Sequence, residues 1–172
     1  YIVAANMFSD DIKQKGRETV VKEFLHHSQN SLSSWLFHSL IRLYYSLQTN
    51  NDLLVAQALA YFELVKSSFV LEGNVQKDTS YFDELLEIKN KSNFEFTSTY
   101  SMGKLKDILE YKEISNLIFY LDDIESNEDK LLELFVSRYI KSRDFYILHV
   151  ITGFHALVEL KSYFSNYEEV LK

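Results

Sequence analysis

Polar side chains interrupt a strongly apolar stretch of the sequence, residues 33–48. In it, four polar residues follow one another at spacings of four, four and three: Ser34, His38, Arg42 and Tyr45. Residues three and four apart share one face of an α-helix, so these side chains would form a polar stripe. Because an unpaired buried guanidinium is costly, we expect Arg42 to meet a carboxylate, carbonyl groups, a ligand anion or solvent in a cavity.

The acids that we expect to pair with Arg42 are Glu63 and Glu159, each of which lies in a largely apolar helical stretch. A structural interpretation competes with a functional one. In it, His38 and Arg42 form a satisfied polar network, or the aliphatic stem of Arg42 carries its charge to solvent. The functional interpretation is that these groups line a ligand site.

A second polar group lies near the C-terminal end. His149 and Thr152 are three residues apart, as are Thr152 and His155, so the threonine can sit between two imidazoles on one helix face. Histidines in apolar surroundings can donate or accept protons near neutral pH. Gly153 costs on the order of 1 kcal/mol within a helix, and we expect it to permit close packing against the small residues at 56–60.

The elements that must position these residues are predicted to be helices, because the chain has no proline and four glycines, too few turn residues for many hairpins. The expected fold is an all-α bundle of about seven to eight helices around two nearly all-apolar central ones, 33–48 and 143–164. Periodicity and capping residues predict the following helices, with 90–100 as a loop or extended piece: about 9–28, 33–48, 52–73, 80–89, 101–110, 112–122, 127–141 and 143–164.

Length and composition narrow the class of protein. The 172 residues suit a single all-α domain over 1–172, and without cysteine the chain cannot form disulfides or Cys-ligated metal sites. No apolar run approaches the roughly 18 residues of a membrane span. Because the absence of cysteine favours a reducing compartment, we expect a cytoplasmic protein. The net charge of −7 disfavours binding to nucleic acid. The 13 Phe and 12 Tyr suit both cores and ligand pockets.

The sequence contains no complete motif for metal binding, phosphate binding or nucleophilic catalysis. Glu23 and His26 have the spacing of a di-iron ligand pair, but the second pair that such a site needs is missing. Three histidines, His38, His149 and His155, have no diagnostic zinc spacing. The sequence also lacks a Gly-rich phosphate loop and a nucleophile elbow. We therefore assign no metal.

Two motifs resemble a known family. The sequence FHSLIRLYYSL at 37–47, followed by AQALAY at 56–61, is similar to a signature of the questin oxidase-like proteins. The sequence LHVITGFHAL at 148–157 resembles a second signature of that family. Two matches in the right order are more specific than either alone. The resemblance covers about 24–69 and 145–164. Family members are commonly longer, with a preceding Asn-His element that is not matched here, so we expect a fragment or a shortened member.

The resemblance implies a helical oxidoreductase related to fungal Baeyer–Villiger-type enzymes that open an anthraquinone ring with NADPH as reductant. It also implies an aromatic-walled, buried pocket for a hydrophobic small molecule. The expected catalytic residues are His38, Arg42, His149 and His155, and the expected substrate-binding residues are Ser34, Trp35, Tyr45 and Thr152. The alternative is a non-catalytic helical module that binds a hydrophobic ligand or a protein partner, and a homo-oligomer is left open.

Overall fold

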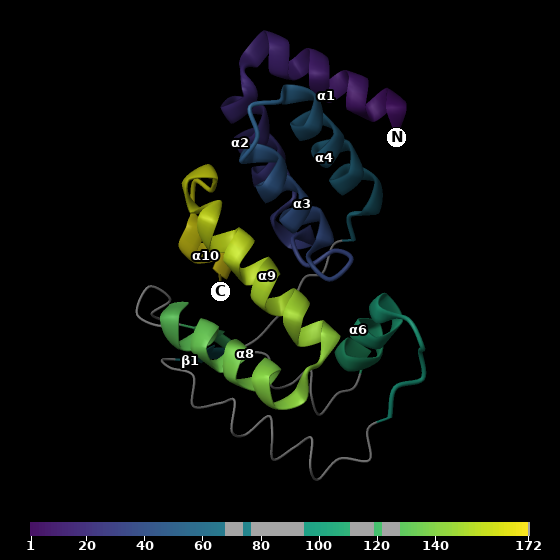
Figure 1. Ribbon diagram of the computed structural model, residues 1–172, viewed down its shortest axis with the longest axis vertical. Helices are drawn as coiled ribbons and strands as arrows, with labels where there is room; N and C mark the ends of the chain where they lie inside the picture. The colour runs from purple at the N-terminus through teal and green to yellow at the C-terminus, as the bar shows by residue number, and fades with distance from the viewer. Residues whose placement is uncertain (68–73, 77–94, 111–118, 122–127, 172) are drawn as a thin grey trace. The chain divides into compact units, whose positions relative to one another are not determined.

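The computed structural model describes residues 1–67, 74–76, 95–110, 119–121 and 128–171. The all-α class is confirmed, with one small parallel pair of strands in addition (Figure 1). The predicted helix at 80–89 lies outside these residues. The α-helices described are α1 (Ile2–Lys15), α2 (Arg17–His27), α3 (His38–Leu47), α4 (Asp52–Val65), α6 (Ser101–Glu110), α8 (Glu128–Ser142), α9 (Phe145–Glu159) and α10 (Tyr167–Leu171).

Contacts divide the chain into two compact units. The first comprises Tyr1–Phe69 with Arg138–Val170, and the second Val70–Ser137 with Leu171–Lys172. Units of contact need not be independently folding domains, so one domain over 1–172 stays a prediction. Among the described residues, none of the helices has both the length and the apolar character that crossing a membrane requires.

The predicted first helix at 9–28 is two helices that meet at Gly16. This glycine has a φ of 85°, a conformation that residues with a side chain rarely adopt, and it separates α1 from α2. Arg17 fixes the junction to the start of α4, because its Nε donates to Asp52 at 2.7 Å and its Nη1 donates to the Thr49 carbonyl at 2.9 Å. The helical segment begins at Ile2, earlier than predicted.

Helix α3 begins at His38 and not at residue 33, because three consecutive residues before it are left-handed. Trp35, Leu36 and Phe37 have φ values of 50°, 55° and 64°. Such a conformation costs a residue with a side chain roughly 1–2 kcal/mol. A hydrogen bond stabilises the turn: the buried Ser34 hydroxyl accepts from Ser67 N at 2.9 Å. Ser34 and Trp35 are therefore not part of the helix that carries His38 and Arg42.

The core of the first unit is centred on α4, which contacts α1, α2 and α3. Its side chains at 55, 56, 58, 59, 60 and 62 have no exposed area. The alanines among them allow neighbouring helices to approach closely, and Phe62 packs edge-on against Phe24 with ring centroids 5.3 Å apart. The side chain of Asn51 caps α4 by accepting from Leu53 N at 3.0 Å. The helix ends at Val65, short of the predicted end at 73.

The two helices predicted to be central are only partly buried. Helix α3 buries Leu40 and Leu43 but exposes His38, Arg42 and Tyr45, because a helix with one polar face turns it to solvent. Helix α9 runs beside α3 (Figure 1). Asp144 caps α9, accepting from the amides of the second and third following residues at 2.7 and 3.2 Å. The helix ends at Glu159, before the predicted 164.

The second unit contains α6, the first part of α8 and the strands β1 (Asn74–Gln76) and β2 (Phe119–Leu121). The strands pair in parallel with Val75 opposite Tyr120. The predicted helix at 112–122 is therefore wrong at 119–121, where a run of apolar and aromatic residues forms a strand. Its remainder lies outside the described residues. The bounds of α6 match the prediction, and those of α8 match within one residue.

Candidate functional site

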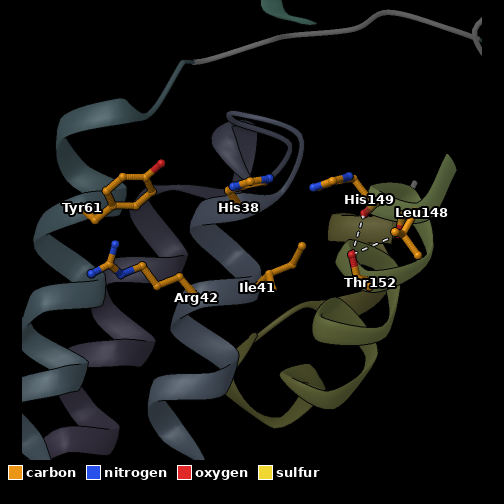
Figure 2. Close-up of a pocket in the computed structure, with 7 residues that line it drawn as sticks. All are labelled: His38, Ile41, Arg42, Tyr61, Leu148, His149 and Thr152. Carbon is orange, nitrogen blue, oxygen red and sulfur yellow. Dashed lines mark hydrogen bonds between the residues drawn. The ribbon is translucent and has the colours of Figure 1, made fainter. Parts of the chain in front are cut away.

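A pocket of about 410 Å³ opens between α3, α4 and α9 in the first unit (Figure 2). Its volume lies in the range of small-molecule sites, about 300–1,000 Å³. It is lined by His38, Ile41, Arg42, Tyr61, Leu148, His149 and Thr152. The sequence predicted a buried pocket, and this is corrected: His38 and Arg42 are exposed and the other lining residues are half-buried. The polar face of α3 borders the open side of the pocket.

Two imidazoles from different helices stack on one another at the pocket. The rings of His38 and His149 lie 4.7 Å apart between centroids, with an angle of 6° between their planes (Figure 2). Phe145 continues the aromatic group, with its centroid 4.2 Å from that of His149. Desolvation of the ring lowers the pKa of His38, and the neighbouring His149 lowers it further. Both effects favour the neutral form of His38.

The hydrogen bonding of His149 defines which of its nitrogens faces a ligand. Its Nδ1 lies 2.8 Å from the carbonyl oxygen of Phe145. A carbonyl can only accept, so Nδ1 carries the hydrogen. In the neutral ring, Nε2 is then the acceptor, with a lone pair available for a proton. This arrangement gives the pocket one oriented proton acceptor.

Arg42 does not form the predicted ion pair with Glu63 or Glu159. Its guanidinium lies over the ring of Tyr61, with Cζ 4.9 Å from the ring centroid (Figure 2). Glu63 instead pairs with Lys66 at 2.7 Å, one turn further along the chain. Within the part of the chain that the structure describes, Arg42 has no carboxylate partner. The contact with the face of an aromatic ring does not occupy the N–H donors of the guanidinium. These donors can therefore still bind an anion.

The remaining lining residues provide one polar and two apolar surfaces. The hydroxyl of Thr152 donates within its own helix, at 3.1 Å to the Leu148 carbonyl and 3.3 Å to the His149 carbonyl. Its only hydrogen is used, so Thr152 can offer a ligand only its lone pairs. Ile41 and Leu148 present hydrocarbon. The pocket therefore suits a molecule with an apolar body and a polar edge.

Four of the predicted site residues do not line this pocket. Ser34 is fully buried and bonds to Ser67, and Trp35 is 55 % exposed in the left-handed turn. Tyr45 is 59 % exposed and packs on Tyr44, which also contacts the edge of the His155 ring at 5.4 Å. The structure thus brings together His38, Arg42, His149 and Thr152, and it separates them from the other four.

Three lining residues were missing from the sequence-based site: Ile41, Tyr61 and Leu148. All three lie inside the two family motifs, which is the signal that could have identified them. Tyr61 was missed because an aromatic ring was not considered as a partner for Arg42. In the described ranges, no group of three or more His, Cys, Asp or Glu residues is arranged to hold a metal ion.

Comparison with known proteins gives one result about relationship. A family model described as questin oxidase-like matches residues 5–171, nearly the whole chain. No curated protein and no solved structure matches the chain significantly. The match extends well beyond the two motifs, through the stretch between them and the N-terminal helices. The chain belongs to the questin oxidase-like family.

Proposed function

We propose that this protein is an oxidoreductase that binds a flat aromatic small molecule with one acidic oxygen in the pocket between α3, α4 and α9. The observation that carries the proposal is the combination, in one open pocket, of a proton-accepting imidazole and a guanidinium that has no carboxylate partner among the described residues. Membership in the questin oxidase-like family supports the oxidoreductase class. The pocket supports the class of substrate.

The charge of the pocket favours a monoanion. Among the described residues that line it, only Arg42 has a permanent charge, and the lowered pKa of His38 favours the neutral form of that ring. A phenolate or carboxylate oxygen near the guanidinium would form a charge-assisted hydrogen bond. The stacked imidazoles and the Tyr61 ring offer flat surfaces against which an aromatic body packs.

The proposed chemical contribution of the protein is a proton transfer. The O–H bond of a phenol breaks, its proton passes to Nε2 of His149, and the oxygen keeps the electron pair as a phenolate beside Arg42. The Phe145 carbonyl holds the other nitrogen of the ring, so the imidazole is oriented before the substrate arrives. The phenolate is electron-rich, which is the form in which such rings are most easily oxidised.

NADPH, which the family resemblance implies, does not fit this pocket. A dinucleotide has two ring systems and several phosphates, and proteins hold such phosphates with helix N-termini, Gly-rich loops or clusters of cations. The pocket offers one guanidinium and about 410 Å³. We therefore propose it as the site of the aromatic substrate alone.

The binding test uses 2-hydroxyanthraquinone, whose visible absorption changes when its hydroxyl ionises, and 2-methoxyanthraquinone, which cannot ionise. At pH 7 we expect the hydroxy compound to bind as the phenolate and the methoxy compound to bind about tenfold more weakly, since one charge-assisted contact is lost. His149→Gln should abolish the spectral change. His27→Gln is the matched control, because His27 Nδ1 makes the same contact to a carbonyl four residues earlier, at 2.6 Å from Glu23, outside the pocket.

A second test separates the two function classes. The protein is incubated with 2-hydroxyanthraquinone under oxygen, with and without NADPH, and products are followed by mass spectrometry. Formation of an oxygenated or ring-opened product that His149→Gln reduces supports the oxidoreductase. Binding without any product would leave a ligand-binding protein, and absence of binding to either compound would contradict the proposed site.

A further inference from the structure

Gly153 lies against Phe37, and no larger residue has room at this position. A Cβ at position 153 would overlap Cβ and Cγ of Phe37 and lie 2.8 Å from its Cδ2. The overlapping atoms are those nearest the Phe37 backbone, so rotation of the ring does not remove the conflict. The atoms nearest to this position belong to Phe37 and not to the alanines of α4 that the sequence suggested.

This contact lies next to the imidazole stack and connects the same two chain segments. Phe37 directly precedes His38, and Gly153 follows His149 by four residues, one helical turn along the same face of α9. Each segment thus contributes one member to the close packing contact and one to the stack. A shift of Phe37 away from α9 would carry His38 with it, because the two residues are adjacent in the chain.

The conformation of Phe37 makes the contact more specific. Its φ of 64° is left-handed, and it ends the turn in which Trp35 and Leu36 are also left-handed. A residue with a side chain keeps this conformation only when surrounding contacts hold it. Because Gly153 has no side chain, Phe37 can pack directly against the backbone of α9 at the point where the turn ends and α3 begins.

We propose that Phe37 and Gly153 are positioning residues that set the register of α3 on α9 and so hold the His38 ring stacked on His149. The functional consequence rests on the proposed function, since the stack forms one wall of the proposed substrate pocket. The stack is a contact between two side chains of the protein itself. It can therefore be tested in the protein alone.

The test is NMR of the histidine rings in the ligand-free protein. Stacked rings shift each other's proton resonances, and the pKa of His38 follows from a pH titration. Gly153→Ala should remove the mutual ring-current shifts and raise the pKa of His38 toward its usual value near 6.5. Val158→Ala, on the same helix and outside the pocket, is the control that should change neither quantity. Gly153→Ala should also weaken 2-hydroxyanthraquinone binding, about tenfold or more, whereas Val158→Ala should leave it unchanged.

Moving the glycine to the other partner tests the packing argument. In the double variant Phe37→Gly with Gly153→Ala, the new methyl group meets no side chain at position 37, so the unfolding free energy lost in Gly153→Ala should be partly recovered. If Gly153→Ala folds with unchanged His38 resonances and pKa, the proposal is overturned. If that variant does not fold, Phe37→Ala decides: unstacked resonances support the proposal and unchanged ones overturn it. Unchanged binding with loss of the stack would contradict the proposed function, not the positioning role.

Discussion

Replacing Arg42 with methionine should weaken ligand binding while leaving the protein almost as stable as before. The guanidinium has no described carboxylate partner, so its removal leaves no acid unpaired. What the fold loses is the contact with the Tyr61 ring, worth about 0.5–1 kcal/mol at an exposed site. For a chain of 172 residues, this corresponds to a fall in Tm of about 1–4 °C.

The effect on binding should be larger. A hydrogen bond to a charged group contributes about 1.5–3 kcal/mol, and we take the lower end because Arg42 is exposed. A loss of about 1.5 kcal/mol raises Kd for 2-hydroxyanthraquinone roughly tenfold, measured by titration calorimetry at pH 7. The methionine side chain retains most of the hydrocarbon stem, so the change reports on charge.

Arg17→Met is the matched control with the opposite expected result. Arg17 pairs with Asp52 at 2.6 Å and donates to the Thr49 carbonyl, so its loss should cost about 1–2 kcal/mol of unfolding free energy, discounted because Asp52 is half exposed. Its effect on Kd should be negligible. The reasoning would be refuted if Arg42→Met destabilised the protein more than Arg17→Met did, or if it left Kd unchanged.

Three further predictions concern stability, measured by denaturant unfolding. Phe62→Ala should cost about 3–5 kcal/mol, because this side chain has no exposed area and its removal leaves a cavity; a loss below 1 kcal/mol would contradict its place in the core. Asn51→Ala should cost about 1 kcal/mol by removing the cap of α4, whereas Asn50→Ala, at an exposed neighbour, should cost little. The pKa of His38, which lies beside His149 and Arg42, is lowered on folding. The unfolding free energy should therefore fall as the pH drops below about 6.5, the pKa of an unfolded histidine, and His38 should have no effect above that pH. His38→Gln should flatten this part of the pH dependence of stability.

Local signals predicted the fold class and several helices well. The absence of proline and the helical spacing of apolar residues indicated an all-α protein, and the acids Glu128 and Asp129 in the first turn indicated the start of α8. The start of α3 could not be predicted in this way. Trp35, Leu36 and Phe37 continue the helical pattern of their neighbours, and only tertiary contacts make them left-handed.

The sequence predicted four of the eight expected site residues correctly as lining one pocket, because local spacing groups residues within a helix but not between helices. His38 and Arg42 lie four residues apart in α3, and His149 and Thr152 three apart in α9, so helical spacing was sufficient to group each pair. Ser34 was grouped with them by the same spacing but lies outside the helix. Tyr61 is on α4, and no periodicity within one helix indicates which side chain of another helix it will face. Contacts between helices depend on packing that the local pattern does not encode.

The left-handed turn and the open pocket have a common physical basis. If residues 33–48 formed one continuous helix, Ser34 would lie one turn before His38 and on the same face as Arg42, as the spacing predicted. Instead, α3 begins only at His38, after the left-handed turn, and Phe37 lies against Gly153. The His38 ring is then at the first position of α3, where it stacks on His149. The strain in the turn is therefore associated with exposure of an imidazole pair next to an arginine, the arrangement from which we infer the binding of an aromatic anion.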